Sequence, residues 1–247
     1  MRRLNTDKTE VIVFSSKHKE QFVGDLEMTV GQSKIKPSAV VRNLGAFFDS
    51  RMNMMNHVNS VCRSSYAQLR QIGHIRQYIT YDATKSLVNS LVTSRLDYCN
   101  SLLYKLPKTT LNKLQTVQNT AARIITKTPR ASHITPVLKE LHWLPLESRV
   151  QYKILTLTYK ALNGRAPAYL KSLLEQYRPS RALRSQENAL RLVQPMRKTV
   201  TYGDRCFYVC APQLWNSLPG SIRQLDSFTA FKKVLKTHLF IQHYAPQ

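Results

Sequence analysis

The chain has 247 residues, of which 43% are hydrophobic and 9% aromatic, so it can bury a core and is not a disordered tail. It carries 37 Lys and Arg residues against 14 Asp and Glu residues, a formal net charge of +23. An excess of this size repels itself unless a polyanion binds, which indicates nucleic acid as the partner, with a membrane surface as the weaker alternative.

The sequence shows no segment typical of targeting to a membrane. Met1 is followed by two arginines and then by polar residues, unlike a secretion signal, and no apolar run approaches roughly 18 residues. The four cysteines are too few and too scattered for a disulfide scaffold. We therefore expect an intracellular protein, in the cytoplasm or nucleus, without a membrane partner. The sequence leaves its oligomeric state open.

The first 50 residues have the pattern of short β-strands. Residues 9–14 read TEVIVF, a run rich in β-branched and aromatic side chains, and are predicted to form a strand. Three further strands are predicted at residues 26–30, 33–37 and 40–48. Together these segments predict a small, partial β-sheet.

From Asn53 onward the apolar residues recur with a helical period. Helices are predicted at residues 55–79, 82–104, 109–127, 134–141, 147–163, 167–177 and 227–241, with Asp82 as the N-cap of the second. The basic segment 178–188 is expected to be a loop, and residues 190–193 are expected to pair with 205–209 as a hairpin. The predicted fold class is α+β and mainly helical, with a small partial sheet, a helical bundle and a C-terminal α+β region.

Two groups of residues could bind metal, and neither has a convincing pattern. Asp25 and Glu27 would share one face of a strand, but the alternation makes that face the solvent side, so a surface pair is favoured over a two-metal site. Cys206 and Cys210 are separated by 27 residues from His238-x₄-His243, far from the usual zinc spacing, so core cysteines are favoured. No metal site is predicted, and no hydrolase or nucleotide-binding fingerprint is present.

Basic residues gather on the predicted helix faces. Residues 51–130 carry twelve Lys and Arg residues but only two acids, Asp82 and Asp97. Two stripes are predicted, one of Arg63, Arg70 and His74 and one of Lys113, Arg123 and Lys127. Because almost no acid interleaves with them, contact with phosphates is favoured over a merely solvated face.

Aromatic residues near these stripes allow a second kind of contact. The tyrosines at 66, 78, 81, 98 and 104 could stack on bases, although residues with this helical spacing more often lie at the edge of a core. Trp143 and Trp215 each lie beside Leu and Pro and are predicted to anchor helix ends.

Eight strings occur in a fixed order along the chain: "LNTDKTEVIVF", "VRNLGAFFD", "SLVTSRLDYCNSLLY", "KLQTVQNTAARIIT", "HITPVLKELHWLPLESRVQYKI", "APAYL", "RALRS" and "APQLWNSLP…SFTAFKKVLKTHLF". In this order they resemble the C-terminal third of a non-LTR (LINE-type) retrotransposon reverse transcriptase of the jockey-like superfamily. The resemblance covers residues 4–243.

The resemblance implies a domain division and several site residues. Residues 1–50 would be the end of the palm, 51–130 the helical thumb that follows the primer–template backbone, and 131–247 the C-terminal region of the family. Lys8 would be the palm-motif lysine near the departing pyrophosphate, where it stabilises charge or donates a proton. Asn43, Leu44 and Gly45 would belong to the primer-grip hairpin.

The family's Mg²⁺-binding aspartates are expected upstream of Leu4, so no cofactor is expected within this sequence. The leading hypothesis is therefore a catalytically inactive fragment that retains nonspecific binding of RNA and DNA. Two alternatives stay open. The chain could be a structural or interaction fragment without a nucleic-acid role, or an incomplete gene model of an active RNA-directed DNA polymerase.

Overall fold

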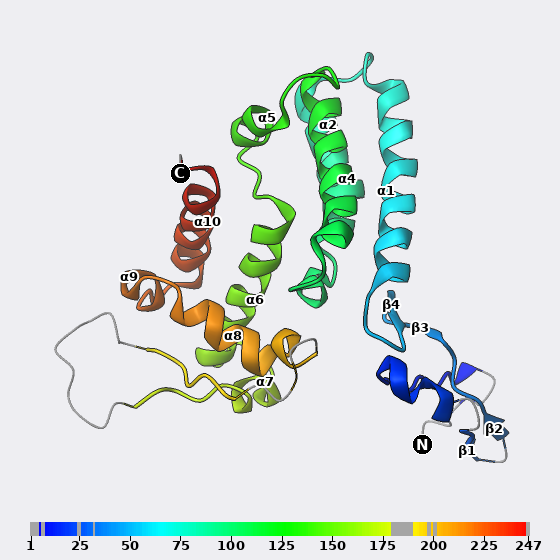
Figure 1. The fold of residues 1–247 in the computed structure, drawn as a ribbon. Coiled ribbons are helices and arrows are strands. Elements are labelled where there is room, and N and C mark those ends of the chain that lie inside the picture. Colours follow the sequence, from blue (N-terminus) through cyan, green and yellow to red (C-terminus); the bar gives the residue numbers. More distant parts are fainter. Residues whose placement is uncertain are drawn as a thin grey trace. The chain divides into compact units, whose positions relative to one another are not determined.

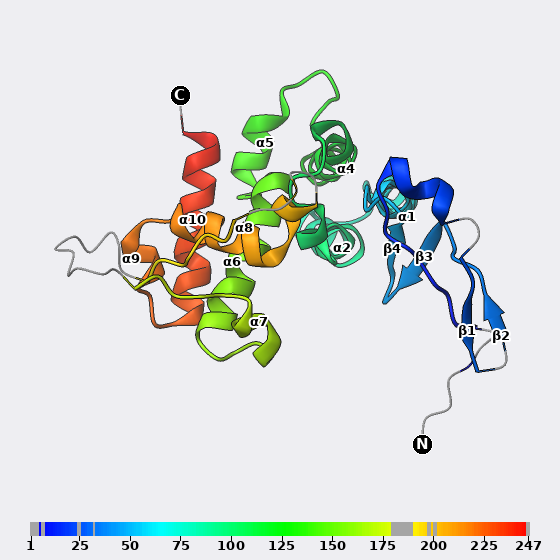
Figure 2. The ribbon, with the colours of Figure 1, turned by 60° about the horizontal axis from the view of Figure 1, so that its bottom comes forward.

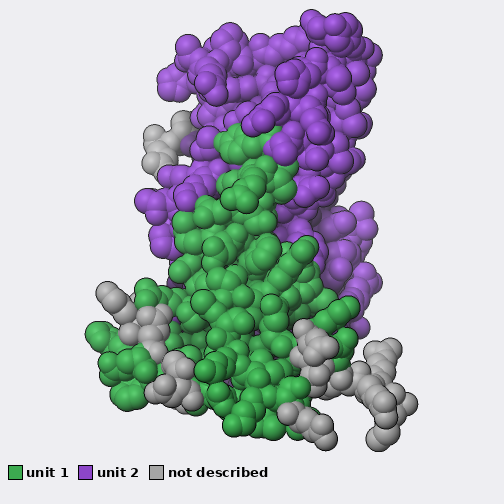
Figure 3. All heavy atoms as spheres, turned by 90° about the vertical axis from the view of Figure 1, so that its right-hand side faces the viewer, with its two compact units in different colours: residues 1–66 green, residues 67–247 purple. Residues whose placement is uncertain are grey.

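A computed structural model gives the fold and describes residues 5, 8–23, 26–31, 33–178, 190–196, 199 and 202–245. The fold is α+β and mainly helical, as the sequence predicts. The chain divides into two compact units, residues 1–66 and residues 67–247, which are coloured separately in Figure 3. The three-part division at residues 50 and 130 remains a prediction.

The N-terminal unit contains two separate antiparallel hairpins. Strand β1 (Met28–Val30) pairs with β2 (Ser33–Ile35), and β3 (Val40–Asn43) pairs with β4 (Ala46–Asp49). A 3₁₀-helix, η2 (Lys17–Phe22), precedes them in the chain (Figure 1). The predicted strand at 40–48 is thus a hairpin in itself.

The predicted strand at residues 9–14 is wrong. In this segment only Val11 forms a β-bridge, a parallel one with Pro37, and its carbonyl accepts a 2.7 Å hydrogen bond from the Ser38 N–H. The β-branched residues supply the propensity for a strand, but a strand also requires a neighbour that pairs along its length.

Helix α1 (Met55–Ile75) begins beside a buried carboxylate. Both oxygens of Asp49 accept backbone N–H groups that follow it, those of Arg51 (3.1 Å), Asn53 (2.9 Å) and Met54 (2.7 Å). The helix ends four residues earlier than predicted, because tighter turns follow Ile75 and the Arg76 side chain bonds to the Ile79 carbonyl.

The second predicted helix is interrupted and shorter than expected. It consists of α2 (Tyr81–Val88), a π-helical turn η3 (Asn89–Thr93) and α3 (Ser94–Asp97). Its N-cap is Thr80, whose hydroxyl accepts the Ala83 N–H, and not Asp82 as predicted. Cys99 has φ 53° and ends the run, and a 3₁₀-helix, η4 (Asn100–Leu103), follows.

The next three helices are close to their predicted positions. They are α4 (Lys108–Thr126), α5 (Ile134–Glu140) and α6 (Leu146–Leu162). Helix α4 packs against α2, α5 and α6, and its buried face includes Leu114, Val117 and Ala121 (Figure 1). Pro107 and Pro145 occupy the N-cap positions of α4 and α6, where a missing backbone N–H carries no cost.

The expected hairpin between residues 190–193 and 205–209 is wrong. Residues 191–193 instead run beside 175–177, where the Tyr177 N–H donates to the Arg191 carbonyl at 2.8 Å. The pairing shortens the predicted helix at 167–177 to α7 (Ala168–Ser172). Most of the predicted loop at 178–188 lies outside the described residues.

Residues predicted as the second hairpin strand begin a helix. Helix α8 (Phe207–Asn216) follows a 3₁₀-turn, η6 (Gly203–Arg205), and α9 (Gly220–Arg223) precedes the C-terminal α10 (Phe228–Tyr244), which is confirmed. Helix α8 contains Pro212 and buries Val209 and Trp215. The local β-propensity of this segment is overridden by the apolar surface that the helix buries.

The core of the second unit lies where α6 packs against α8 and α10 (Figure 2). The Tyr159 and Phe231 rings stack with centroids 4.3 Å apart, and Trp215 lies beside Phe231. The indole N–H of Trp215 donates to the Leu190 carbonyl at 2.7 Å. Trp143 is also buried, and its carbonyl accepts the Tyr244 hydroxyl. Both tryptophans are anchors, as predicted.

Candidate nucleic-acid interface

Helix α1 presents the first predicted stripe. Arg63, Arg70 and His74 are all exposed, and their spacing of seven and four residues places them on one side of the helix. None of the 21 residues of α1 is acidic. Its cationic side chains therefore have no intrahelical carboxylate partner.

Helix α4 also lacks acidic residues along its 19 positions. Lys113 is exposed in its second turn. Lys127 is the C-cap, has φ 56° and is exposed, and its N–H donates to the Arg123 carbonyl. A lysine at this end of a helix interacts favourably with the carbonyl dipoles and still presents its ammonium group to solvent.

Arg123 has a structural role that the sequence did not predict. Its guanidinium donates to the Pro129 carbonyl and, at 2.8 Å, to the Ser132 carbonyl, so it closes the loop after α4. The same side chain is partly exposed. Part of the hydrogen-bonding capacity of Arg123 is thus used within the chain.

Arg76 is the residue that sequence reasoning missed. Its guanidinium donates to the carbonyls of Ile124 (2.9 Å), Ile125 (2.8 Å) and Ile79 (3.1 Å). These bonds join the end of α1 to the last turn of α4, and so bring His74 and Lys127 to the same end of the two helices. Only a contact pattern spanning 48 residues reveals this role, and periodicity carries no such signal.

The hairpin expected to resemble a primer grip has an exposed tip. Leu44 and Gly45 form the turn with φ values of 46° and 86°, the left-handed conformation typical of a two-residue hairpin loop. Leu44 is 84% exposed. Asn43 pairs with Ala46 at the end of the ladder. Lys8 is exposed in the N-terminal segment, and its backbone N–H donates to Asn5.

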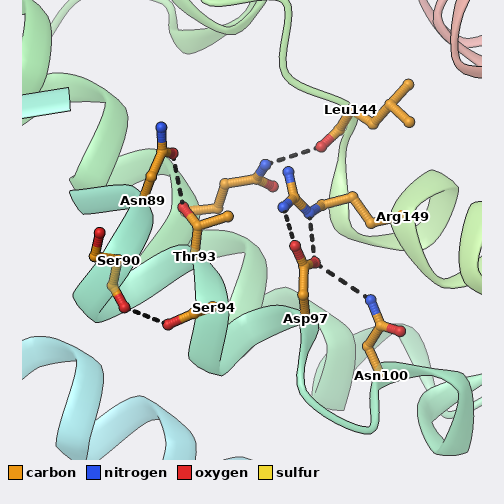
Figure 4. A network of polar contacts seen from close by, with 9 residues as sticks. Asn89, Ser90, Thr93, Ser94, Asp97, Asn100, Leu144 and Arg149 are labelled. Atoms are coloured by element: carbon orange, nitrogen blue, oxygen red, sulfur yellow. Dashed lines mark hydrogen bonds and ion pairs between the residues drawn. The ribbon is translucent and has the colours of Figure 1, made fainter. Parts of the chain in front are cut away.

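Two acids of the second unit are engaged away from the basic stripes. Asp97 receives a bidentate pair from Arg149, and Asp204 lies 3.2 Å from the Lys105 ammonium. Figure 4 shows Arg149 facing Asp97, with Asn89, Thr93 and Asn100 around them. These carboxylates are therefore already paired with cations that belong to neither stripe.

Most of the tyrosines near the stripes are partly exposed, as expected at the edge of a core, and Tyr78 is largely exposed. Tyr78 is 79% exposed and Tyr98 49%, with Tyr66 and Tyr81 also on the surface. Only Tyr104 is half-buried, and burial raises the pKa of its hydroxyl to about 12. Tyr78 presents most of its side chain to solvent, as stacking on a base requires.

No family model, no curated protein and no solved structure matches this chain.

The candidate metal ligands take ordinary structural positions. Glu27 lies 3.6 Å from Lys34 and 3.7 Å from Lys36 on an exposed surface, whereas Asp25 lies outside the described residues. Cys206 is the N-cap of α8 and Cys210 is buried within it, where burial raises the pKa of its thiol to about 12. Within the described ranges, no group of three or more His, Cys, Asp or Glu residues could hold a metal ion.

No helix in the part of the chain that the structure describes is long and apolar enough to cross a membrane. Chemically, α1 and α4 each present cations and contain no acidic residue, and Tyr66 on α1 is exposed. Such a surface attracts polyanions through phosphate contacts that carry no sequence information.

Proposed function

We propose that this chain binds primer–template nucleic acid without sequence preference, as a thumb-like part of a non-LTR reverse transcriptase. The phosphate contacts come from Arg63, Arg70, His74, Lys113, Arg123 and Lys127. The proposal concerns binding of RNA and DNA and assigns no catalytic residue to the chain.

One observation carries the proposal: the two longest helices, α1 and α4, present cations and contain no acidic residue. A solvated helix normally mixes charges of both signs, because opposite charges one turn apart stabilise it by about 0.2 to 0.5 kcal/mol per pair. Helices without such pairs present cations that no carboxylate of the same helix neutralises. The exposed tip at Leu44 and the motif order of the sequence favour primer–template duplex over other polyanions.

A salt titration with an RNA–DNA duplex tests the mechanism. Each neutralised phosphate releases counterions, so the affinity should fall steeply between about 50 and 200 mM salt, with a log–log slope of about −0.9 per contact. An affinity that does not change over this range would exclude phosphate neutralisation. The chain would then be better explained as an interaction fragment without a nucleic-acid role.

A matched pair of double variants assigns the binding to the stripes. Arg70→Gln/Lys127→Gln should lower the duplex affinity and reduce the magnitude of the salt slope by about 2, since two phosphate contacts are lost. Arg165→Gln/Lys171→Gln removes the same charge from exposed positions outside α1 and α4 and should leave the slope nearly unchanged. If the two double variants lose affinity equally, the net charge acts as a whole and the stripes are not the interface.

A further inference from the structure

A second basic feature lies inside the C-terminal unit and shares no residue with the stripes. It is a cavity of about 600 Å³ that opens to the surface between α2, η3, α6, α10 and the segment joining α5 to α6. Its size falls within the range typical of small-molecule sites. One wall is apolar and aromatic, with Trp143, Leu144 and Tyr152.

The cavity is also lined by positively charged side chains. Lys85 from α2, Lys153 from α6 and Lys236 from α10 all line it. The pKa of Lys236 is lowered, first by burial and then by the positive charges of Arg149 and Lys85. Helices α2, α6 and α10 thus each place a positive charge at the same cavity. The repulsion between these charges costs free energy unless an anion binds there.

The single carboxylate of the cavity does not neutralise these lysines, because Arg149 already pairs with it. Arg149 Nε donates to Asp97 at 2.9 Å, and the second guanidinium nitrogen donates to the other carboxylate oxygen (Figure 4). Asn100 Nδ2 also donates to Asp97, at 3.3 Å. Asp97 therefore holds Arg149 in position, and the three lysines keep their net positive charge.

A backbone irregularity also lies in the wall of the cavity. Asn89 and Thr93, the ends of the π-helical turn η3, line the cavity. Turns of this type occur frequently at functional sites.

We propose that this cavity binds a phosphate monoester of nucleotide size, with the phosphate between Lys85, Lys153 and Lys236 and the base against Trp143 and Tyr152. Lysine ammonium groups bind phosphate by charge-assisted hydrogen bonds. The proposal does not rest on duplex binding by α1 and α4, because no residue is shared.

Calorimetry with the full chain tests the proposal, using adenosine 5′-monophosphate, adenosine and inorganic phosphate as probes. We expect the monophosphate to bind at least about tenfold more tightly than adenosine, since only the monophosphate meets the lysines. Lys236→Gln and Lys85→Gln should each weaken its binding about tenfold. Equal affinities for adenosine and its monophosphate, or no binding of either, would overturn the proposal.

The matched control lies on the same helix. Lys233→Gln removes the same charge from an exposed position of α10 that does not line the cavity, and it should change the affinity by less than about twofold. If Lys233→Gln weakens binding as much as Lys236→Gln does, the site is only general positive charge and the proposal is wrong.

A pair of short DNA strands distinguishes the two sources of the ligand. If a strand with a 5′-phosphate competes with the free monophosphate and the same strand with a 5′-hydroxyl does not, the cavity binds strand ends. Binding of the free monophosphate without such competition assigns it to a free nucleotide. Both results support a monoester site, and failure of duplex binding in the salt titration would affect neither.

Discussion

At the scale of single residues, several side chains fix the structure through partners that the sequence did not indicate. Arg76, Asp49 and Arg123 each bond to two or more backbone groups that follow or lie far from them in the chain. Arg123 belongs to a predicted stripe, and Arg76 and Asp49 lie beside a stripe and at a strand end, but the partners of all three are visible only in three dimensions.

Arg76→Ala should destabilise the C-terminal unit by about 2 to 3 kcal/mol, because three carbonyls lose a charged donor. Arg76→Lys should recover only part of this loss, since an ammonium group cannot reproduce the planar guanidinium contacts. Urea unfolding followed by circular dichroism measures both. Arg130→Ala, at an exposed position, serves as the control, and an equal effect there would contradict the role of Arg76.

His57 should make stability depend on pH. The imidazole is 4% exposed, its Nδ1 has no hydrogen-bond partner among the described residues, and burial lowers its pKa from 6.5. The folded state therefore binds a proton at His57 less readily than the unfolded state does. The free energy of unfolding does not depend on this group well above pH 6.5, and it falls as the pH drops below 6.5.

The comparison of wild type with His57→Gln tests this dependence. Between about pH 7.5 and pH 5.5 the loss of stability in urea should be smaller in the variant, which has no titrating group at this position. Burial lowers the pKa of His238 as well, so part of the dependence should persist. Identical pH profiles for the two proteins would show that His57 can be protonated without cost.

At the scale of elements, helices with a long apolar stripe were predicted closely: α4 and α6 within one residue at each end, and α10 within three. Their burial follows directly from the helical period. Short segments were less predictable, because Val11 and residues 205–209 have β-propensity but adopt what their neighbours allow. The end of α1 was set by tertiary contacts of Arg76, which no local rule contains.

Two glycines provide a matched test of helix boundaries. A Cβ at Gly73 or at Gly164 would have nothing within 4 Å, so space is equal at both sites. Gly73 lies within α1, and Gly73→Ala should stabilise the protein by about 0.5 to 1 kcal/mol. Gly164 has φ 66° after α6, and Gly164→Ala should destabilise it by about 1 kcal/mol.

Differential scanning calorimetry of the two alanine variants gives the signs directly. Opposite shifts of the unfolding temperature would confirm that conformation, and not crowding, decides the effect. A destabilising Gly73→Ala would mean that α1 ends before residue 73 in solution.

At the scale of the whole molecule, the net charge of +23 should limit stability at low ionic strength. Sodium chloride shortens the Debye length from about 20 Å to about 7 Å between 20 and 200 mM, so the unfolding temperature should rise over this range. Sucrose at matched osmolality is the uncharged control. A flat or falling profile would indicate that the charges are already compensated in the folded chain.

The sequence by itself determined three properties of this protein: a mainly helical α+β fold, strong basicity and two exposed cationic helix faces. These follow from period and residue type, which are local and additive. The tertiary structure alone decided that Arg123 closes a loop, that Arg76 joins α1 to α4, and that lysines from three elements surround one cavity. Such convergence depends on how helices distant in sequence pack, and no pattern along the chain encodes it by itself.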